Sequence, residues 1–285
     1  MTNKWQEMYQ QKLRSADECA KLVQDGDGII ASIGLGQVEI FLNAIGKRIR
    51  ENDLKDIFYT GGVDVKWNDL LSPDIQNRFT YNSGFVGEAV RLGCSKGIYT
   101  YSANRMGDSV RILSDLLPHV PKSIVTTVVS PMDEHGYFSS GTNADLCWGA
   151  WRSGNFRDLI VEVNQHMPFT CGNNHYHISE ITALMENHAP LVEVPTPPPS
   201  DKDEIIGKLI AERVRDGACI QIGIGSMPNA VARHLADKND LGVHTEMLCD
   251  ALVDLFNAGV ITGAKKNINR NKMVASFALG SNKLY

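Results

Sequence analysis

The sequence has little of what nucleic-acid-binding and membrane proteins need. Its 28 Lys and Arg residues are outnumbered by 33 Asp and Glu residues, so the formal net charge at pH 7 is −5. Without a basic excess the chain offers little to neutralise a phosphate backbone. No stretch approaches the roughly 18 uninterrupted apolar residues of a transmembrane helix, and the polar start MTNKWQEMYQQKLRS lacks the apolar core of a secretory signal. We therefore expect no nucleic acid and no membrane among its partners.

Cysteine pairs at the spacing of metal or redox sites are also missing. Six cysteines are scattered along the chain without a CxxC motif: Cys19, Cys94, Cys147, Cys171, Cys219 and Cys249. In a chain without a secretory signal this usage indicates the reduced, mostly buried thiols of a cytoplasmic protein, and we expect no disulfides. Cys171, His175 and His177 are close in sequence, but their spacing matches no strong zinc pattern, so we expect no metal site.

What is present is the composition of an ordinary globular protein, with 43% hydrophobic and 21% charged residues among 285. This length predicts about two domains. The segment VEVPTPPPSDKDE holds four of the 11 prolines and favours an extended connector. We predict an N-terminal α/β domain over residues 1–194, a linker over 195–202, and the first part of a C-terminal α/β domain over 203–285.

The same ordered string of features lies on both sides of this linker. Each copy has a helix-patterned run, an Asp-Gly turn, a short apolar run, a Gly-x-Gly loop, an amphipathic helix and an Asp-Leu pair. The turns are Asp25–Gly26 and Asp216–Gly217. Strand-like and helix-like runs alternate, which predicts two related open α/β units with mostly parallel sheets. Because only 285 − 200 = 85 residues follow the linker, we expect the second unit to be incomplete.

The loop QIGIGSMPNAV is a candidate site for binding a negatively charged group. Glycines let the backbone approach a ligand, and the free N–H groups of a helix start favour negative charge. That arrangement suits a pyrophosphate or the oxyanion of acyl transfer, but it also occurs as a plain tight turn. Glu246 lies 246 − 225 = 21 residues past Gly225, where a ribose-binding acid would fall, although Pro228 replaces the third small residue of a dinucleotide fingerprint. Read from this motif alone, Glu246 is an acid in the first turn of the following helix, where it would interact with the helix dipole. The residues alone do not decide between a pyrophosphate site, an oxyanion site and a purely structural turn.

In their order, QIGIGSMPNAV, LGVHTEM, AGVITGAKK and FALGS resemble the acetyl-CoA hydrolase/transferase family. Within it, the 4-hydroxybutyrate and butyryl-CoA:acetate CoA-transferases are the most similar. WQEMYQQKLRSADEC, VSPMDEHGYFSSGTNADL and the Pro-rich linker agree, so the resemblance covers essentially the whole chain. It implies a class I CoA-transferase (NagB/RpiA-like) fold of two related α/β domains, the second one C-terminally truncated here, and a homodimer.

The resemblance also implies the site. Glu246 of the His-Thr-Glu-Met motif matches the covalent nucleophile, and the CoA-binding loop matches Gln221, Ile222, Gly223, Ile224 and Gly225. Gly34 and Gly36 would line the cleft without a catalytic role. The implied reaction moves CoA between a short-chain acyl-CoA and a carboxylate through a glutamyl-CoA thioester, with acyl-CoA as a substrate, no metal and no tightly bound cofactor. The alternatives are an acyl-CoA hydrolase, an inactive truncated family member and, more remotely, a nucleotide-binding oxidoreductase.

Overall fold

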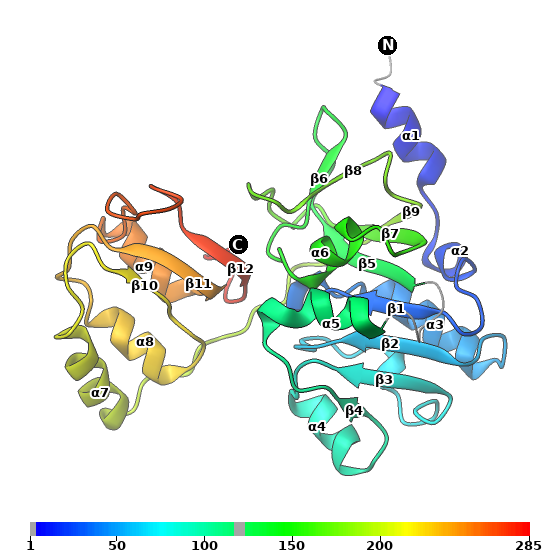
Figure 1. The fold of residues 1–285 in the computed structure, drawn as a ribbon, viewed down its shortest axis with the longest axis horizontal. Helices are drawn as coiled ribbons and strands as arrows, with labels where there is room; N and C mark the ends of the chain where they lie inside the picture. The colour runs from blue at the N-terminus through cyan, green and yellow to red at the C-terminus, as the bar shows by residue number, and fades with distance from the viewer. Residues whose placement is uncertain (1–3, 117–122) are drawn as a thin grey trace. The chain divides into compact units, whose positions relative to one another are not determined.

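A computed structural model describes residues 4–116 and 123–285, and the chain divides into two compact units, Met1–Leu191 (unit 1) and Val192–Tyr285 (unit 2). Both are built from strands and helices in alternation (Figure 1). Residues 195–199 form neither helix nor strand, and helix α7 (Asp201–Ala211) begins after its N-cap Ser200. Within the described ranges, no helix is long and apolar enough to cross a membrane.

Unit 1 is organised around a seven-stranded sheet in the order β4-β3-β2-β1-β5-β7-β9. All of its neighbouring strands pair in parallel, which confirms the predicted α/β class. The strands are β1 (Gly28–Ala31), β2 (Ile57–Gly61), β3 (Phe79–Ser83), β4 (Thr100–Tyr101), β5 (Ser123–Val129), β7 (Asp158–Val163) and β9 (Ala183–Glu186). A separate antiparallel pair joins β6 (Tyr137–Ser139) to β8 (His175–His177).

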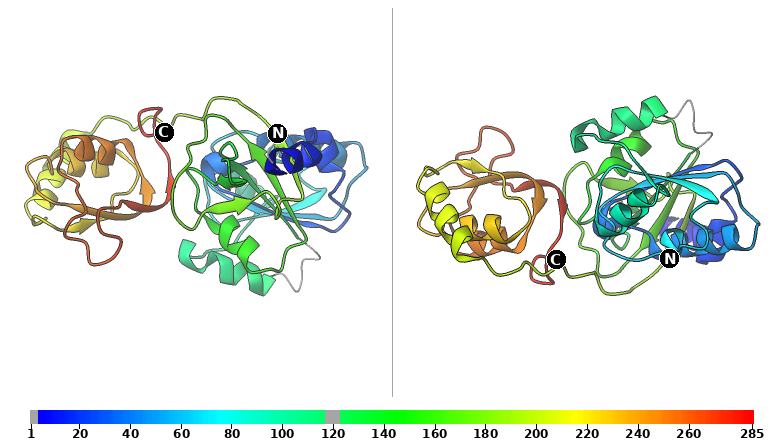
Figure 2. Two further views of the ribbon diagram at one scale, coloured as in Figure 1. Left: turned by 90° about the horizontal axis from the view of Figure 1, so that it is seen from above. Right: turned by 90° about the horizontal axis from the view of Figure 1, so that it is seen from below.

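Helices lie on both faces of this sheet (Figure 2). They are α1 (Lys4–Lys12), α2 (Ala16–Ala20), α3 (Glu39–Arg50), α4 (Glu88–Ser95), α5 (Ser109–Leu116) and α6 (Leu146–Arg152), with short 3₁₀ turns η1 (Gly34–Gly36), η2 (Asp69–Leu71) and η3 (Met106–Asp108). Every residue of β1 is buried. A strand that is covered on both faces reads as a continuous apolar run, which is why the run before the first glycine loop predicts it.

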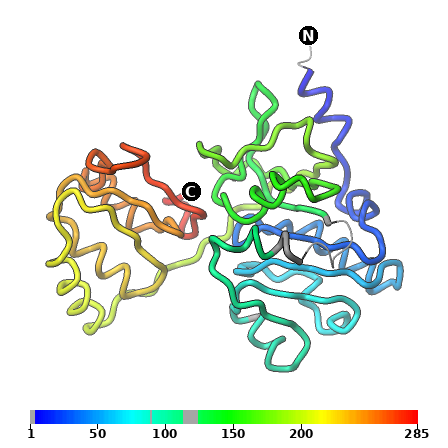
Figure 3. Tube along the Cα trace, viewed as in Figure 1, coloured from blue at the N-terminus to red at the C-terminus, as the bar shows by residue number. Residues whose placement is uncertain are grey.

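Unit 2 contains a three-stranded parallel sheet in the order β10-β11-β12. Its strands are β10 (Cys219–Ile220), β11 (Gly242–Leu248) and β12 (Val274–Ala278), and its further helices are α8 (Ser226–Arg233) and α9 (Asp250–Asn257). The chain can be followed from α7 to Tyr285 in Figure 3. The Tyr285 hydroxyl donates to the carbonyl oxygen of Val192 at 2.9 Å, which joins the two ends of the unit.

The repeated Asp-Gly turns make the same contacts in both units. In unit 1 the Gly26 N–H donates to the Lys55 carbonyl oxygen, and the Asp25 carboxylate accepts the Lys55 N–H at 3.0 Å. In unit 2 Gly217 and Asp216 make the same two bonds with Asn239. Both glycines have positive φ, 79° and 75°, which explains why glycine follows aspartate in both copies. The repeat seen in the sequence is therefore confirmed as a structural repeat.

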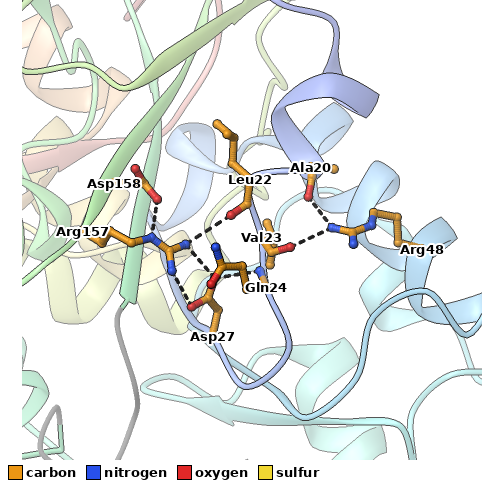
Figure 4. Close-up of polar contacts among 8 residues, drawn as sticks. All are labelled: Ala20, Leu22, Val23, Gln24, Asp27, Arg48, Arg157 and Asp158. Atoms are coloured by element: carbon orange, nitrogen blue, oxygen red, sulfur yellow. Dashed lines mark hydrogen bonds and ion pairs between the residues drawn. The ribbon is translucent and has the colours of Figure 1, made fainter.

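Arg157 stabilises the turn that leads into β1 (Figure 4). The Arg157 guanidinium donates to both carboxylate oxygens of Asp27, at 2.9 and 2.7 Å, and through Nε to Asp158 at 2.6 Å. The Asp27 side chain is only 4% exposed. The bond to Asp27 is the main reason that the pKa of Arg157 is raised. On the other side of the turn, Arg48 donates to two backbone carbonyl groups of the same segment.

A buried carboxyl group lies near the carboxyl end of β7. Glu162 is 2% exposed, and its Oε1 accepts a hydrogen bond from Asn187 Nδ2 at 3.0 Å. Its Oε2 is buried without a partner among the described residues. Burial raises the pKa of Glu162 from 4.5 to about 7, although the nearby charge of Lys66 lowers it. Glu162 therefore holds a proton in the folded protein at pH values where the unfolded chain has lost it.

This difference predicts a pH-dependent stability. Between pH 4.5 and about 7 the folded state binds the extra Glu162 proton, so its contribution to the free energy of unfolding falls as the pH rises. The upper limit is about 3 kcal/mol, since one pKa unit corresponds to about 1.4 kcal/mol. Glu162→Gln keeps the acceptor for Asn187 and removes the titration. We expect it to match the parent at pH 4.5 and to exceed it in stability at pH 8, measured by urea denaturation. A difference that is constant over this range contradicts the assignment.

Candidate active site

Glu246 belongs to a strand, not to the junction between strand and helix that the sequence suggests. β11 continues to Leu248, and the first helical turn after it carries Asp250 as its acidic residue. The strand is longer because Met247 pairs with Phe277 of β12 and Leu248 pairs with Ala278. Side chains alternate along it, with Thr245 and Met247 buried and Glu246 exposed. The helix-start reading of Glu246 is therefore wrong, and its carboxylate is open to solvent.

The structure brings Glu246 beside the glycine loop. β10 and β11 are parallel, with Cys219 opposite Gly242, and continuing this register places Gly223 opposite Glu246. A side-chain bond supports the alignment, since Thr245 Oγ1 donates to the Ile222 carbonyl oxygen at 3.0 Å. Sequence reasoning missed this role of Thr245. The carboxyl ends of neighbouring parallel strands are where ligands bind in open α/β sheets.

The loop Gln221–Gly225 leads directly into the start of α8. Gly225 has a φ of 126° and forms the N-cap of α8 without a side-chain cap, and Pro228 lies in the first turn as the sequence suggests. The first N–H groups of a helix have no partner inside it, so those of Ser226 and Met227 point out of the helix end. Gly223 is exposed, and a Cβ added to it would meet nothing within 4 Å.

A small pocket within unit 2 adjoins this loop. It is lined by Gly223 and Gly225, by Met247 and Cys249 at the end of β11, and by Leu279. Burial raises the pKa of the Cys249 thiol. The thiol therefore stays protonated at neutral pH, which makes it a poor nucleophile. Glu246 does not line this pocket, because its exposed side chain lies on the opposite side of β11 from Met247.

In unit 1, side chains from elsewhere in the unit bond to the corresponding glycine loop. Ile33 is held by two of them: its N–H donates to Asp145 at 2.9 Å, and its carbonyl oxygen accepts from Asn143 at 2.7 Å. Asp145 also accepts a hydrogen bond from the Ser32 hydroxyl group. A Cβ on Gly36 would lie 2.1 Å from Ser32 Oγ. Gly36 is therefore required by close packing, and Gly34 by its positive φ of 53°; that neither has a catalytic role stays a prediction.

The histidines near Cys171 make structural contacts. His175 Nε2 lies 2.8 Å from the Thr170 carbonyl oxygen. The His177 ring packs edge-on against Trp5 and Tyr137, with ring centroids 4.6 and 4.8 Å apart. In the part of the chain that the structure describes, no three His, Cys, Asp or Glu side chains are grouped so that they could hold a metal ion.

Comparisons with known proteins identify the family of the chain. The acetyl-CoA hydrolase/transferase N-terminal domain matches residues 1–195. A succinyl-CoA:cyclohexane-1-carboxylate CoA transferase of Geobacter metallireducens is 35% identical over 99% of this chain and 62% of its own length. A butyryl-CoA:acetate CoA-transferase of Anaerostipes caccae is 36% identical over 99% of this chain and 63% of its own.

Solved structures give the same result. RipA from Yersinia pestis is similar with a TM-score of 0.91 and 32% identity, over 99% of this chain and 67% of that one. A 4-hydroxybutyrate CoA-transferase of Porphyromonas gingivalis follows with a TM-score of 0.79 and 29% identity, over 99% of this chain and 66% of that one. The chain spans less than two thirds of the curated relatives just described. It belongs to the acetyl-CoA hydrolase/transferase family.

Proposed function

We propose that this chain carries the nucleophile and the CoA-binding loop of a CoA-transferase. The observation that carries the proposal is the exposed carboxylate of Glu246 on the strand beside an open glycine loop, Gln221–Gly225. Relatives named as CoA-transferases support the reaction class. The acyl donor would be a short-chain acyl-CoA and the acceptor a carboxylate, as with 4-hydroxybutyrate, butyrate and acetate.

The proposed reaction proceeds in balanced steps. The Glu246 carboxylate attacks the thioester carbonyl, and the tetrahedral intermediate expels CoA thiolate and leaves a mixed anhydride between the acyl group and Glu246. The thiolate then attacks the glutamyl carbonyl and expels the acyl group as a carboxylate, which leaves a glutamyl-CoA thioester. An incoming carboxylate reverses both steps and departs as a new acyl-CoA, with Glu246 restored. Covalent catalysis thus splits one difficult exchange into easier steps and conserves the thioester bond energy.

The loop would stabilise the tetrahedral intermediates. Each one carries an oxyanion, and backbone N–H donors of the loop and of the α8 start can face it. One such donor is worth about 10²–10³ in rate. Access of water to the glutamyl thioester decides between transfer and hydrolysis, so an acyl-CoA hydrolase is the alternative function of the same site. A homodimer and a cytoplasmic location are part of the proposal.

The experiment that tests the proposal is the intact mass of the protein before and after incubation with butyryl-CoA. We expect a CoA-sized increase that peptide mapping places on Glu246. Glu246→Gln should show no increase, and Glu212→Gln, at an exposed glutamate of the same unit, should behave as the parent. The absence of an adduct on the parent chain, or an adduct on another residue, overturns the proposal for this chain.

A separate prediction concerns the loop backbone. Gly223→Val places a side chain where a Cβ meets nothing within 4 Å, so the free energy of unfolding should change by no more than about 0.5 kcal/mol. The side chain would nevertheless keep the thioester from the backbone, and misplacement of about 1 Å can cost about 10²-fold. We expect a loss of that size in the rate of adduct formation, measured by mass, and a smaller loss for Gly223→Ala. An unchanged rate for the valine variant removes the loop from the mechanism.

A further inference from the structure

The hydrogen-bonded pairing of β10 with β11 stops before the loop Gln221–Gly225. Its register ends with Ile220 opposite Val243, although β11 continues beyond that pair. The next bond of a parallel ladder would join the Ile222 N–H to the His244 carbonyl oxygen. In the described part of unit 2, the loop makes neither this bond nor any other backbone hydrogen bond to β11. Backbone pairing therefore does not hold the loop to the strand.

A threonine side chain makes the contact at this point instead. Thr245 Oγ1 lies 3.0 Å from the Ile222 carbonyl oxygen and 3.1 Å from the Met247 carbonyl oxygen. A hydroxyl group has one proton to donate, which these two acceptors share, so the hydroxyl group bridges the loop and β11. Thr245 and Ile222 are each 5% exposed. Water therefore has little access to take the place of this donor.

Unit 1 has a glycine at the position that corresponds to this threonine. β1 begins opposite Phe58 and β10 begins opposite Gly242. Each of these two residues donates its N–H to the carbonyl group just before the strand, so Phe58 and Gly242 correspond. Three residues later, Gly61 corresponds to Thr245. The first unit therefore has no hydroxyl group at this position.

The glycine loop of unit 1 is held by other means. β1 stays paired with β2 for one residue more, with Ile30 opposite Thr60. Beyond that pair, Asn143 and Asp145 bond to Ile33 from a distant part of the sequence. A hydroxyl group on the neighbouring strand is therefore not a requirement of this type of unit. It is specific to the loop that lies beside the proposed nucleophile.

We propose that Thr245 is a positioning residue for the reaction at Glu246, an inference that rests on the proposed function. Thr245 directly precedes Glu246 in β11. Its partner Ile222 directly precedes Gly223, which lies opposite Glu246 when the register is continued. The bond between Thr245 and Ile222 thus sets how far the carboxylate lies from the loop backbone. Thr245 itself touches no reacting atom, because its side chain points to the buried side of the sheet.

Loss of the hydroxyl group would remove the donor that reaches the Ile222 carbonyl oxygen. A buried carbonyl group without a partner is unfavourable, so the loop would move until water reaches this oxygen. A displacement of about 1 Å is enough to cost about 10²-fold in rate. The thioester would then meet the Glu246 carboxylate and the loop N–H groups in the wrong relative geometry.

The test compares Thr245→Val, which keeps the shape of the side chain without the hydroxyl group, with Thr245→Ser, which keeps the hydroxyl group. The measurement is the single-turnover rate of adduct formation with butyryl-CoA, on variants that urea denaturation shows to be folded. We expect the valine variant to lose about 10²-fold and the serine variant to stay within about 10-fold of the parent. Thr126→Val is the matched control and should keep the parental rate. Thr126 is 0% exposed, and its Oγ1 has no hydrogen-bond partner among the described residues.

A nuclear magnetic resonance measurement without acyl-CoA follows the bond itself. Labelling isoleucine carbonyl carbons with ¹³C and glycine nitrogens with ¹⁵N restricts the correlated signals to the five Ile-Gly pairs of the sequence. Gly223→Ala identifies the signal of Ile222. We expect this signal to shift in Thr245→Val and to stay in place in Thr245→Ser. The signal of Ile33, whose carbonyl oxygen accepts from Asn143, should not change in either variant.

The outcomes separate the positioning role from the proposed function. An adduct that forms equally fast on the parent and on Thr245→Val overturns the positioning role and leaves the proposed function standing. A serine variant as slow as the valine variant overturns it as well. So does a slower valine variant with an unmoved Ile222 signal, because the effect then does not pass through this bond. The absence of an adduct on the parent overturns the proposed function, and the positioning role with it.

Discussion

Glu246→Gln is expected to abolish formation of the CoA adduct, with a loss of at least about 10³-fold in rate. An amide is a far poorer nucleophile than a carboxylate toward a thioester carbonyl. Glu246→Asp should lose about 10²-fold, because its carboxylate is withdrawn by one methylene. Both variants should keep the parent's free energy of unfolding, because the Glu246 side chain is exposed. The measurement is the single-turnover rate of adduct formation with butyryl-CoA, together with urea denaturation.

A comparison with a neighbouring residue makes this result specific to the nucleophile. His244 is exposed on the same side of β11 two residues earlier, so His244→Gln tests whether any change on that side has the same effect. We expect its rate to stay within about 10-fold of the parent's. A Glu246→Gln variant with the full parental rate would end the covalent mechanism. Equal losses in both variants would show that the surface binds substrate without supplying the nucleophile.

Arg157→Met is expected to destabilise unit 1 by about 3 kcal/mol, because it leaves the Asp27 carboxylate buried without a cation, with only the Gln24 N–H still donating to it at 2.8 Å. Arg157 makes two bonds to that carboxylate, which is 4% exposed, and one to Asp158 (Figure 4). The loss would appear as a lower midpoint of urea denaturation. Adding Asp27→Asn to Arg157→Met should recover part of it, because no uncompensated charge then remains buried.

A second ion pair of unit 1 supplies the control. Arg105 pairs with Asp108 three residues away at 2.9 Å, and its side chain is 89% exposed. Exposed pairs of this kind contribute about 0–1 kcal/mol, so Arg105→Met should barely move the midpoint. If Arg157→Met costs as little as Arg105→Met, then the pairing with Asp27 does not hold the turn before β1 in place.

The strands with a strong local pattern could be predicted from the sequence. IFYTGG, KSIVTTVVS and DLIVEVN each contain a strand of the parallel sheet, β2, β5 and β7, because a strand buried on both faces needs a continuous β-branched and apolar run. The ends of strands were less predictable. β11 runs three residues past Thr245 because β12 pairs with it there, and a pairing with a partner some 30 residues later leaves no local signal. The antiparallel pair β6 and β8 has three residues in each strand, too few to show a period.

The two motifs of the candidate site are visible in the sequence, but the difference between the two glycine loops is not. The loop motif and the His-Thr-Glu-Met motif are local, and the structure places them on neighbouring strand ends. That one glycine loop is closed and the other open depends on Asn143 and Asp145. Their bonds to Ile33 cross 110 and 112 residues of chain. Hydrogen bonds over such separations are set by the tertiary fold, so the two loops look alike when only their own residues are read.

The equal registers of the two units show which positions of their sheets correspond. If Gly242 corresponds to Phe58, then Glu246 corresponds to Gly62, the residue just after β2. A Cβ at Gly62 would already touch Phe85, at 3.4 Å from both its Cβ and its backbone nitrogen. A glutamate side chain at that position would have to extend past Phe85. At corresponding strand ends, the first unit thus has a glycine in contact with Phe85, whereas the second unit exposes a carboxylate to solvent.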